Sequence, residues 1–180
     1  MAHNGDPHVQ SFLDIHGWAH SHSEILAADA SMRQYFRLKQ GSKSAILMDA
    51  RRSSQQETQR FCQIAELLKN HGLKTPEILA QNLSVGLLLL EDFGDDLFAR
   101  IIERDPSQTR PLYQASLEML IHLRGMPLPD WLRQPSSEDF AEMISPFWEY
   151  YIDNAELNIG IRQSIGKTLQ KILASLDNGP

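Results

Sequence analysis

Cysteine is almost absent from this 180-residue chain, since Cys62 is its only one. A single cysteine cannot build a disulfide framework, which excludes the small disulfide-stabilised secreted domains. Basic residues are also few, with 17 Lys and Arg against 23 Asp and Glu and a net charge of −6. Nucleic-acid-binding domains carry a basic surface, so this balance argues against a nucleic-acid partner.

Long apolar runs are missing as well. The longest is centred on residues 87–90, which is the length of a buried strand, whereas a membrane-spanning helix needs about 20 residues. The N-terminus lacks the basic and then apolar pattern of a signal peptide. Hydrophobic residues still make up 42% of the chain, enough for a buried core. We therefore expect a cytoplasmic protein with no membrane partner.

The seven histidines do not form a metal-binding pattern. His20 and His22 lie two residues apart with Glu24 beyond them, but no further ligands follow at the spacing of zinc sites. A closed zinc site needs about four ligands. These histidines are therefore interpreted as solvated surface residues, and no metal ligand is predicted in the chain.

The front half of the chain alternates between helix and strand patterns. A short helix is expected within residues 8–20, and residues 28–33 lead as a loop into a hairpin. The hairpin strands are predicted at 35–38 and 45–48, with the turn near Gly41.

A second helix and two more strands follow this hairpin. Ser54 and Glu57 form a capping box before apolar residues at helical spacing, and Gly72 is placed to end that helix. Strands are expected at 77–80 and 87–90. The second is apolar on both faces, which predicts a central strand.

Residues after 93 read as helices only. They are expected from Asp95 or Asp96 to 104, and then at 111–123, 137–152 and 159–176. A small antiparallel sheet with one helix, followed by a helical region, is an α+β pattern. We predict one part at residues 1–93 and a second at 94–180.

Four stretches with this order carry a family resemblance. Residues 29–37 read D-A-S-M-R-Q-Y-F-R, residues 46–50 read I-L-M-D-A, and 72–79 and 86–95 read G-L-K-T-P-E-I-L and G-L-L-L-L-E-D-F-G-D. They resemble the aminoglycoside phosphotransferase and choline kinase superfamily, which has the two-lobed protein-kinase fold. Residues 147–151 resemble, more weakly, an aromatic E-W-Y motif of its second lobe. The similarity is greatest to bacterial cell-wall amino-sugar kinases, which phosphorylate the anomeric hydroxyl of N-acetylmuramate and N-acetylglucosamine.

This resemblance implies ATP as cofactor, an amino sugar as substrate, and Mg²⁺ in the complete protein. Residues 1–93 would be the nucleotide-binding lobe and 94–180 part of the helical lobe. Adenine would bind between the lobes, on backbone groups of the segment that joins them. The candidates for that role are Leu90, Glu91 and Asp92.

The resemblance places the nucleotide phosphates under the loop at residues 29–34, as Gly-rich loops do in protein kinases. This loop has no glycine. Phosphate contacts would come from the backbone amides of Ala30, Ser31 and Met32, or from Arg33, whose planar guanidinium matches phosphate oxygens. A solvated hairpin arginine is the alternative interpretation of Arg33.

One departure from the kinase pattern concerns an ion pair between a lysine and a glutamate. Kinases place a Lys on the third strand and pair it with a Glu on the next helix. Here the strand position falls at Met48, the helix position falls near Phe61, and Glu57 lies one turn earlier. Two apolar groups in these places can pack together, whereas a buried Glu without its Lys would be costly.

A second departure concerns the catalytic residues. Residues 92–94 spell D-F-G, the magnesium-binding tripeptide of protein kinases, but they directly follow a buried strand and are interpreted as a turn. None of the seven histidines has Asp two residues on, so no H-x-D loop is available for phosphoryl transfer. The chain ends about where that loop is expected. Catalysis by these 180 residues alone is therefore not expected.

Two functions stay open at this point. The first is the front part of an ATP-dependent sugar kinase, and the second is a non-catalytic nucleotide- or protein-binding module. In either case the aromatic residues Phe147, Trp148, Tyr150 and Tyr151 predict an apolar patch too large for a monomer, and hence self-association through the helices.

Overall fold

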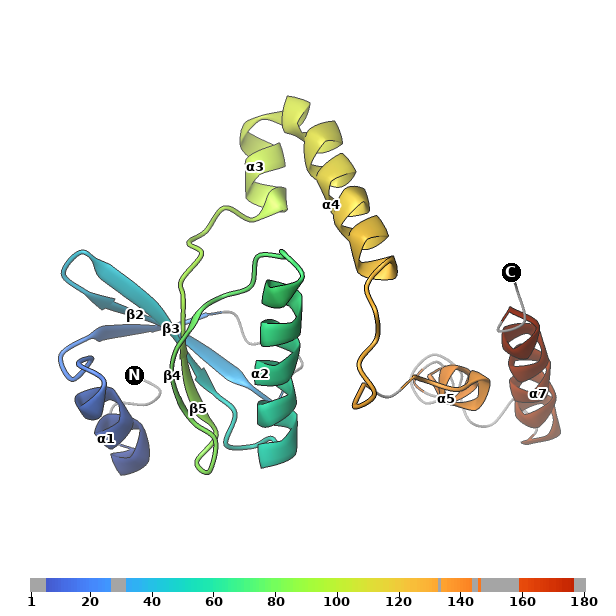
Figure 1. Ribbon diagram of the computed structural model, residues 1–180, viewed down its shortest axis with the longest axis horizontal. Coiled ribbons are helices and arrows are strands. Elements are labelled where there is room, and N and C mark those ends of the chain that lie inside the picture. Colours follow the sequence, from blue (N-terminus) through green and yellow to red (C-terminus); the bar gives the residue numbers. More distant parts are fainter. Residues whose placement is uncertain (1–5, 27–31, 133, 144–145, 147–158, 177–180) are drawn as a thin grey trace. The chain divides into compact units, whose positions relative to one another are not determined.

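The computed structural model describes residues 6–26, 32–132, 134–143, 146 and 159–176 (Figure 1). The chain divides into two compact units, residues 1–126 and 127–180. The first unit contains the sheet and is described first. The predicted boundary near residue 93 stays a prediction.

The first unit is built on a five-stranded antiparallel sheet with the strand order β1-β2-β3-β5-β4. Its strands are β1 (His22–Ile25), β2 (Gln34–Gln40), β3 (Lys43–Asp49), β4 (Ile78–Asn82) and β5 (Leu87–Leu90). β5 lies between β3 and β4, and all four of its residues are buried. The prediction of a central strand from its unbroken apolar run is confirmed.

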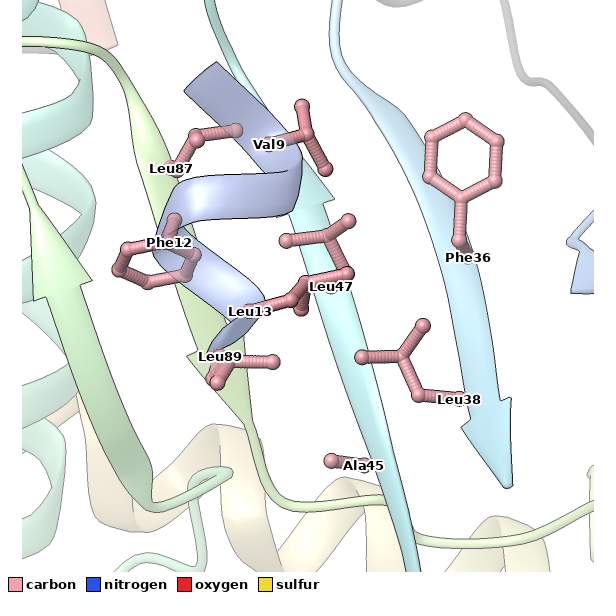
Figure 2. Packing of buried hydrophobic residues seen from close by; sticks show 9 residues of the cluster. All are labelled: Val9, Phe12, Leu13, Phe36, Leu38, Ala45, Leu47, Leu87 and Leu89. Atoms are coloured by element: carbon pink, nitrogen blue, oxygen red, sulfur yellow. The ribbon is translucent and has the colours of Figure 1, made fainter. Parts of the chain in front are cut away.

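One helix packs on each face of the sheet. Helix α1 (Pro7–Ile15) covers one face (Figure 1), and Figure 2 shows its apolar side chains against those of β3 and β5. The buried cluster on this face consists of Val9, Phe12, Leu13, Phe36, Leu38, Ala45, Leu47, Leu87 and Leu89. Because successive strand residues point to opposite faces, Met48, Leu88 and Leu90 form a second cluster under α2 (Gln55–Asn70).

The limits of α2 follow from local chemistry. The Glu57 amide donates to the Ser54 hydroxyl at 3.2 Å, and the Ser54 amide donates to the Glu57 carboxylate at 2.8 Å. Together they satisfy amides that have no partner within the helix. Gly72 follows the last turn with a φ of +77°, a conformation that favours glycine. Both ends of the predicted helix are confirmed.

The predicted sheet was incomplete by one strand. β1 pairs with β2 from His22↔Lys39 to Ile25↔Phe36. Its four residues are mostly exposed and include no alternating apolar pattern, so the sequence gives no period-two signal. Pairing with β2, rather than local propensity, produces this edge strand.

The remaining described elements are helical, which confirms the predicted α+β class. The first unit ends with α3 (Phe98–Arg104), the short 3-10 helix η1 (Pro106–Gln108) and α4 (Thr109–Arg124). The second unit contains α5 (Ser137–Glu142) and α7 (Ile159–Leu176), which pack against each other. None of the described helices is long and apolar enough to cross a membrane.

The predicted cap of α3 is wrong. Its N-cap residue is Leu97, which makes no side-chain capping hydrogen bond. Asp95 instead contacts Arg37, and Asp96 contacts Arg104. Ion pairs with Arg37 and Arg104 therefore occupy the two carboxylates that were predicted to cap α3.

Helix α4 exposes apolar side chains on much of its surface. More than half of the side-chain surface is accessible at most of these positions: Tyr113, Leu117, Met119, Leu120 and Ile121. A helix that is apolar nearly all round is normally buried in a larger protein. The aromatic patch predicted at residues 147–151 lies outside the described residues.

We expect this 180-residue chain to self-associate through α4, because exposed apolar patches of this kind drive association. Light scattering should give a mass above the 20.5 kDa of the monomer. The double variant Leu117→Glu, Ile121→Glu should shift the chain toward the monomer. A monodisperse wild-type monomer that binds no apolar dye would contradict this expectation.

Candidate functional site

The strongest candidate site lies where β5 ends. We call residues 91–95 the hinge segment. It leaves the buried strand β5 and remains tied to β4, because the Glu91 amide donates to the Glu77 carbonyl at 2.8 Å. Lys74 contributes a second tie, with Nζ 3.7 Å from Glu91 Oε1 and 4.8 Å from the centre of the Phe93 ring.

Two backbone groups of the hinge segment are available to a ligand. Within the described residues, the Glu91 carbonyl and the Asp92 amide make no backbone hydrogen bond. The Glu91 amide, by contrast, is already used by Glu77. Because both groups belong to one trans peptide unit, they point in opposite directions, so the edge of a planar base can meet only one of them.

A buried arginine holds the hinge segment against β2. Arg37 Nη1 donates to Asp95 Oδ1 at 2.9 Å, and Nη2 donates to Asp92 Oδ1 at 3.1 Å and to the Gly94 carbonyl at 3.0 Å. Its Nε lies 2.9 Å from Asp92 Oδ2, although that N–H is not aligned for a hydrogen bond. Arg37 and Asp92 are both nearly inaccessible, with side-chain exposures of 10% and 6%.

The ionisation of this cluster follows from its contacts. Burial raises the pKa of Asp92, but hydrogen bonds from the Gly94 amide, Ser44 and Arg37, together with the charge of Arg37, bring it below its ordinary value. The hydrogen bond from Arg37 lowers the pKa of Asp95. Hydrogen bonding to Asp95 raises the pKa of Arg37 against the effect of burial. The cluster is therefore fully ionised at neutral pH.

Sequence reasoning missed the role of Arg37. The sequence does contain a signal for it, because a charged residue stands within the apolar run Tyr35-Phe36-Arg37-Leu38 of a predicted strand. A buried charge needs an opposite charge, and the acidic residues after β5 are its natural partners. Asp95 and Asp96 were instead interpreted as candidate helix caps.

The D-F-G tripeptide has the structure of a turn. Asp92 Oδ1 accepts a hydrogen bond from the Gly94 amide at 2.9 Å, the side-chain-to-backbone pattern of an Asx turn. Gly94 has a φ of +76°, which favours glycine. Because Arg37 and Gly94 engage the Asp92 carboxylate, it does not fit a metal ligand here. Among the described residues, no group of three or more His, Cys, Asp or Glu could hold a metal ion.

The protein interior next to the hinge segment, on the α2 side of the sheet, is apolar. Met48 is fully buried in the cluster with Ala50, Leu88 and Leu90, and Phe61 packs against that cluster. Apolar packing at Met48 and Phe61, expected where kinases have their Lys–Glu pair, is confirmed.

The loop between β1 and β2 lies only partly within the described residues. Of its predicted contacts, Ala30 and Ser31 lie outside the described residues, and Met32 is exposed. Arg33 lies over α2, with its guanidinium carbon 5.6 Å from the centre of the Phe61 ring and Nη2 3.4 Å from the Glu57 carbonyl. The structure thus brings Arg33 to the helix position facing Met48.

The predicted residues therefore form two groups. Arg33, Met48 and Leu90 belong to or border the apolar cluster under α2, whereas Glu91 and Asp92 belong to the hinge segment. Met32 is separate from both, because it lines a hollow of about 250 Å³ with Gln34, Asp49, Arg51 and Arg52.

A hollow of about 580 Å³ lies away from all of these residues, between α2 and the edge strand β4. Cys62, Lys69, Thr75 and Ile78 are part of its lining, and it contains none of the predicted site residues. Its size alone is not a reason to place the site there, because the hinge segment has the free backbone groups and the positioned charges.

Comparison with known proteins gives concordant matches. The profile of the phosphotransferase enzyme family matches residues 22–176. A relative from Caulobacter vibrioides, described as an N-acetylmuramate/N-acetylglucosamine kinase, is 32% identical over 153 residues, which cover 71% of this chain and 42% of the relative. A protein of the same description from Pseudomonas aeruginosa is 37% identical over 95 residues, or 53% of this chain and 27% of the relative.

A third protein of that description, from Pseudomonas putida, is 30% identical over 148 residues, covering 81% of this chain and 42% of the relative. The chain thus spans less than half the length of each of these relatives.

Proposed function

Because the chain belongs to the phosphotransferase enzyme family, we propose that it supplies the nucleotide-binding part of an ATP-dependent sugar kinase. The acceptor is proposed to be an amino sugar of the N-acetylmuramate or N-acetylglucosamine type, phosphorylated at its anomeric hydroxyl. The names of three relatives support this substrate class, and a cytoplasmic location agrees with it.

The observation that supports nucleotide binding best is the hinge segment. Its Asp92 amide makes no backbone hydrogen bond in the described part of the chain, so it can donate to a ring nitrogen of adenine. Leu90 lies two residues before that amide and belongs to the buried apolar cluster that also contains Met48, so the protein interior beside the hinge segment is apolar.

The phosphates of ATP are proposed to bind at the β1–β2 loop. Arg33 is proposed to supply a positive charge there, and backbone amides of residues 30–32 can add hydrogen bonds. With Met48 at the strand position where kinases have Lys, the positive charge comes from the loop instead. Arg33 lies over Phe61, so its guanidinium is partly ordered before the nucleotide arrives.

No group for the chemical step can be assigned from the sequence motifs or among the described residues. Phosphoryl transfer requires a carboxylate that positions the acceptor hydroxyl, together with magnesium ligands. No histidine of the chain is followed two residues later by Asp, and the described carboxylates do not fit a metal site. We therefore assign no catalytic or metal-binding residue within the chain and propose that it does not transfer phosphate alone.

Isothermal titration calorimetry with Mg-ATP tests the proposal. We expect a dissociation constant between about 1 µM and 1 mM, the range in which most enzymes bind substrates. Arg33→Met should weaken ATP binding about tenfold by removing a charge-assisted contact, while adenosine binding stays unchanged.

A matched control for Arg33→Met is Lys43→Met, which removes an exposed cation at the other end of β3. It should bind ATP like the wild type. A chain that binds neither ATP nor adenosine would refute the proposal. If both variants weaken ATP binding equally, the specific role of Arg33 is refuted, because the loss of any positive charge would then have the same effect.

A non-catalytic binding module is the second candidate. The buried Met48 in place of the kinase Lys favours it, because a module without chemistry has no need of that charge. Calorimetry separates the two candidates only in part, since a nucleotide-binding module would also bind Mg-ATP, whereas a protein-binding module would not. Restoration of activity, treated in the Discussion, does.

A further inference from the structure

We propose that Arg37 is a positioning residue that fixes the hinge segment in the conformation that binds nucleotide. The inference rests on the proposed function, because it concerns the same hinge. It adds a residue of β2 to the site proposed where β5 ends.

The register of the sheet brings Arg37 to the hinge. Arg37 pairs with Ile46 of β3, and Ile46 pairs with Leu90, the last residue of β5. These three residues form one row across the sheet. The long side chain of Arg37, at one end of the row, can therefore reach the hinge segment, which follows Leu90 at the other end.

The contacts of Arg37 fix three successive parts of the hinge segment. Its nitrogens reach the Asp92 carboxylate, the Gly94 carbonyl and the Asp95 carboxylate at 2.9–3.1 Å. The planar guanidinium presents its donors in a fixed fork, so these acceptors must keep a fixed arrangement. The Asp92 amide, proposed to meet adenine, belongs to the residue whose side chain is held.

Burial makes the arrangement rigid. Arg37 and Asp92 are shielded from water, so water cannot readily replace either partner, and removing one leaves a charge unpaired in the interior. A hinge without this clamp would sample other conformations. Its affinity for nucleotide would then fall in proportion to the fraction of molecules in the competent one.

A purely structural role for Arg37 is the competing explanation, and the chain offers a matched control for it. Arg51 also pairs with two carboxylates, those of Asp49 and Asp6. It joins the end of β3 to the start of α1, and its hydrogen bonds go to Asp49 and Asp6 rather than to the hinge segment. Loss of either arginine should lower stability, but only loss of Arg37 should alter the hinge.

The test compares nucleotide affinity with thermal stability in Arg37→Met, Arg37→Lys and Arg51→Met. We expect Arg37→Met to raise the dissociation constant for Mg-ATP about tenfold. Arg37→Lys keeps the charge but not the fork, so its dissociation constant should lie between those of the wild type and Arg37→Met. Arg51→Met should lower the melting temperature and bind ATP like the wild type.

Asp95→Asn supplies a milder perturbation, because Asp95 is 58% exposed and its loss leaves no buried carboxylate unpaired. It should fold and weaken ATP binding about two- to threefold, since one of the clamp contacts loses its charge. If Arg37→Met does not fold, Asp95→Asn decides the question, and wild-type affinity in that variant overturns the inference.

The outcomes separate the two proposals. Arg37→Met that binds ATP as tightly as Arg51→Met overturns the positioning role while the proposed function stands. A wild-type chain that binds no ATP overturns both. Selective weakening by the Arg37 and Asp95 variants supports the inference.

Discussion

Replacing Met48 by lysine is expected to lower the free energy of unfolding by about 3–5 kcal/mol, the cost of an uncompensated buried charge. Met48 is fully buried, and its cluster contains Ala50, Leu88 and Leu90 with Phe61 packed against it. No side chain of this cluster, or packed against it, carries a negative charge that could pair with an ammonium group. The lysine that most kinases need at this strand position would therefore be harmful in this chain.

Urea denaturation followed by circular dichroism measures this effect. Met48→Leu is the matched control, because a swap that conserves volume and polarity usually costs under about 1.5 kcal/mol. Adding Phe61→Glu to Met48→Lys recreates the kinase pair and should recover part of the loss, giving a coupling of about 0.5–3 kcal/mol in a double-mutant cycle. A lysine tolerated without loss would mean that a carboxylate such as Glu57 reaches it, which contradicts the apolar account.

Joining the chain to the catalytic portion of a relative is expected to create sugar kinase activity. The kinase from Caulobacter vibrioides is a suitable donor, because this chain matches 42% of it. The donated part would supply the carboxylate that positions the sugar hydroxyl. Because general acid–base groups contribute about 10²- to 10⁴-fold to rates, the fusion should exceed the 180-residue chain by at least that factor.

The assay is the release of phosphorylated N-acetylglucosamine or N-acetylmuramate from Mg-ATP. The control is the same fusion with one change in the donated part, the aspartate of the H-x-D sequence that the family resemblance implies there replaced by asparagine, which should return the activity to background. A fusion that folds and binds ATP but does not phosphorylate either sugar would favour the non-catalytic module. Activity of the unfused chain would contradict the proposal that these residues lack the chemistry.

Much of the fold follows from short-range signals in the sequence. The capping box at Ser54 and Glu57 and the glycine at 72 set the ends of α2. The unbroken apolar run at 87–90 identified the interior strand. In each case the stabilising contact lies within a few residues, or the burial is on both faces, so one segment carries the whole signal.

The features that could not be predicted depend on distant partners. β1 has few apolar residues and exists because β2 offers it a free edge. Arg37 finds its carboxylates 55 and 58 residues later in the chain, a pairing that no local pattern contains. Asp95 was interpreted as a helix cap for the same reason. A cap can be inferred from the local sequence alone, whereas its ionic partner Arg37 lies 58 residues earlier in the chain.

The candidate site shows the same division. The motif residues Met48 and Leu90 meet in one apolar cluster, and Arg33 lies beside it over Phe61. Their proximity depends on the sheet register and the packing of α2. What the sequence resemblance could not convey is how the hinge segment is held, which requires the buried ion pairs of Arg37.

The central claim is that nucleotide binds at the hinge segment, and amide resonances of the isotope-labelled chain test it most directly. On titration with Mg-ATP we expect the largest shifts at the Asp92 and Phe93 amides and in the loop at residues 30–33. Adenosine should shift the hinge amides alone. Shifts centred instead on the hollow between α2 and β4, near Cys62 and Ile78, or no shifts at saturating ATP, would contradict the account.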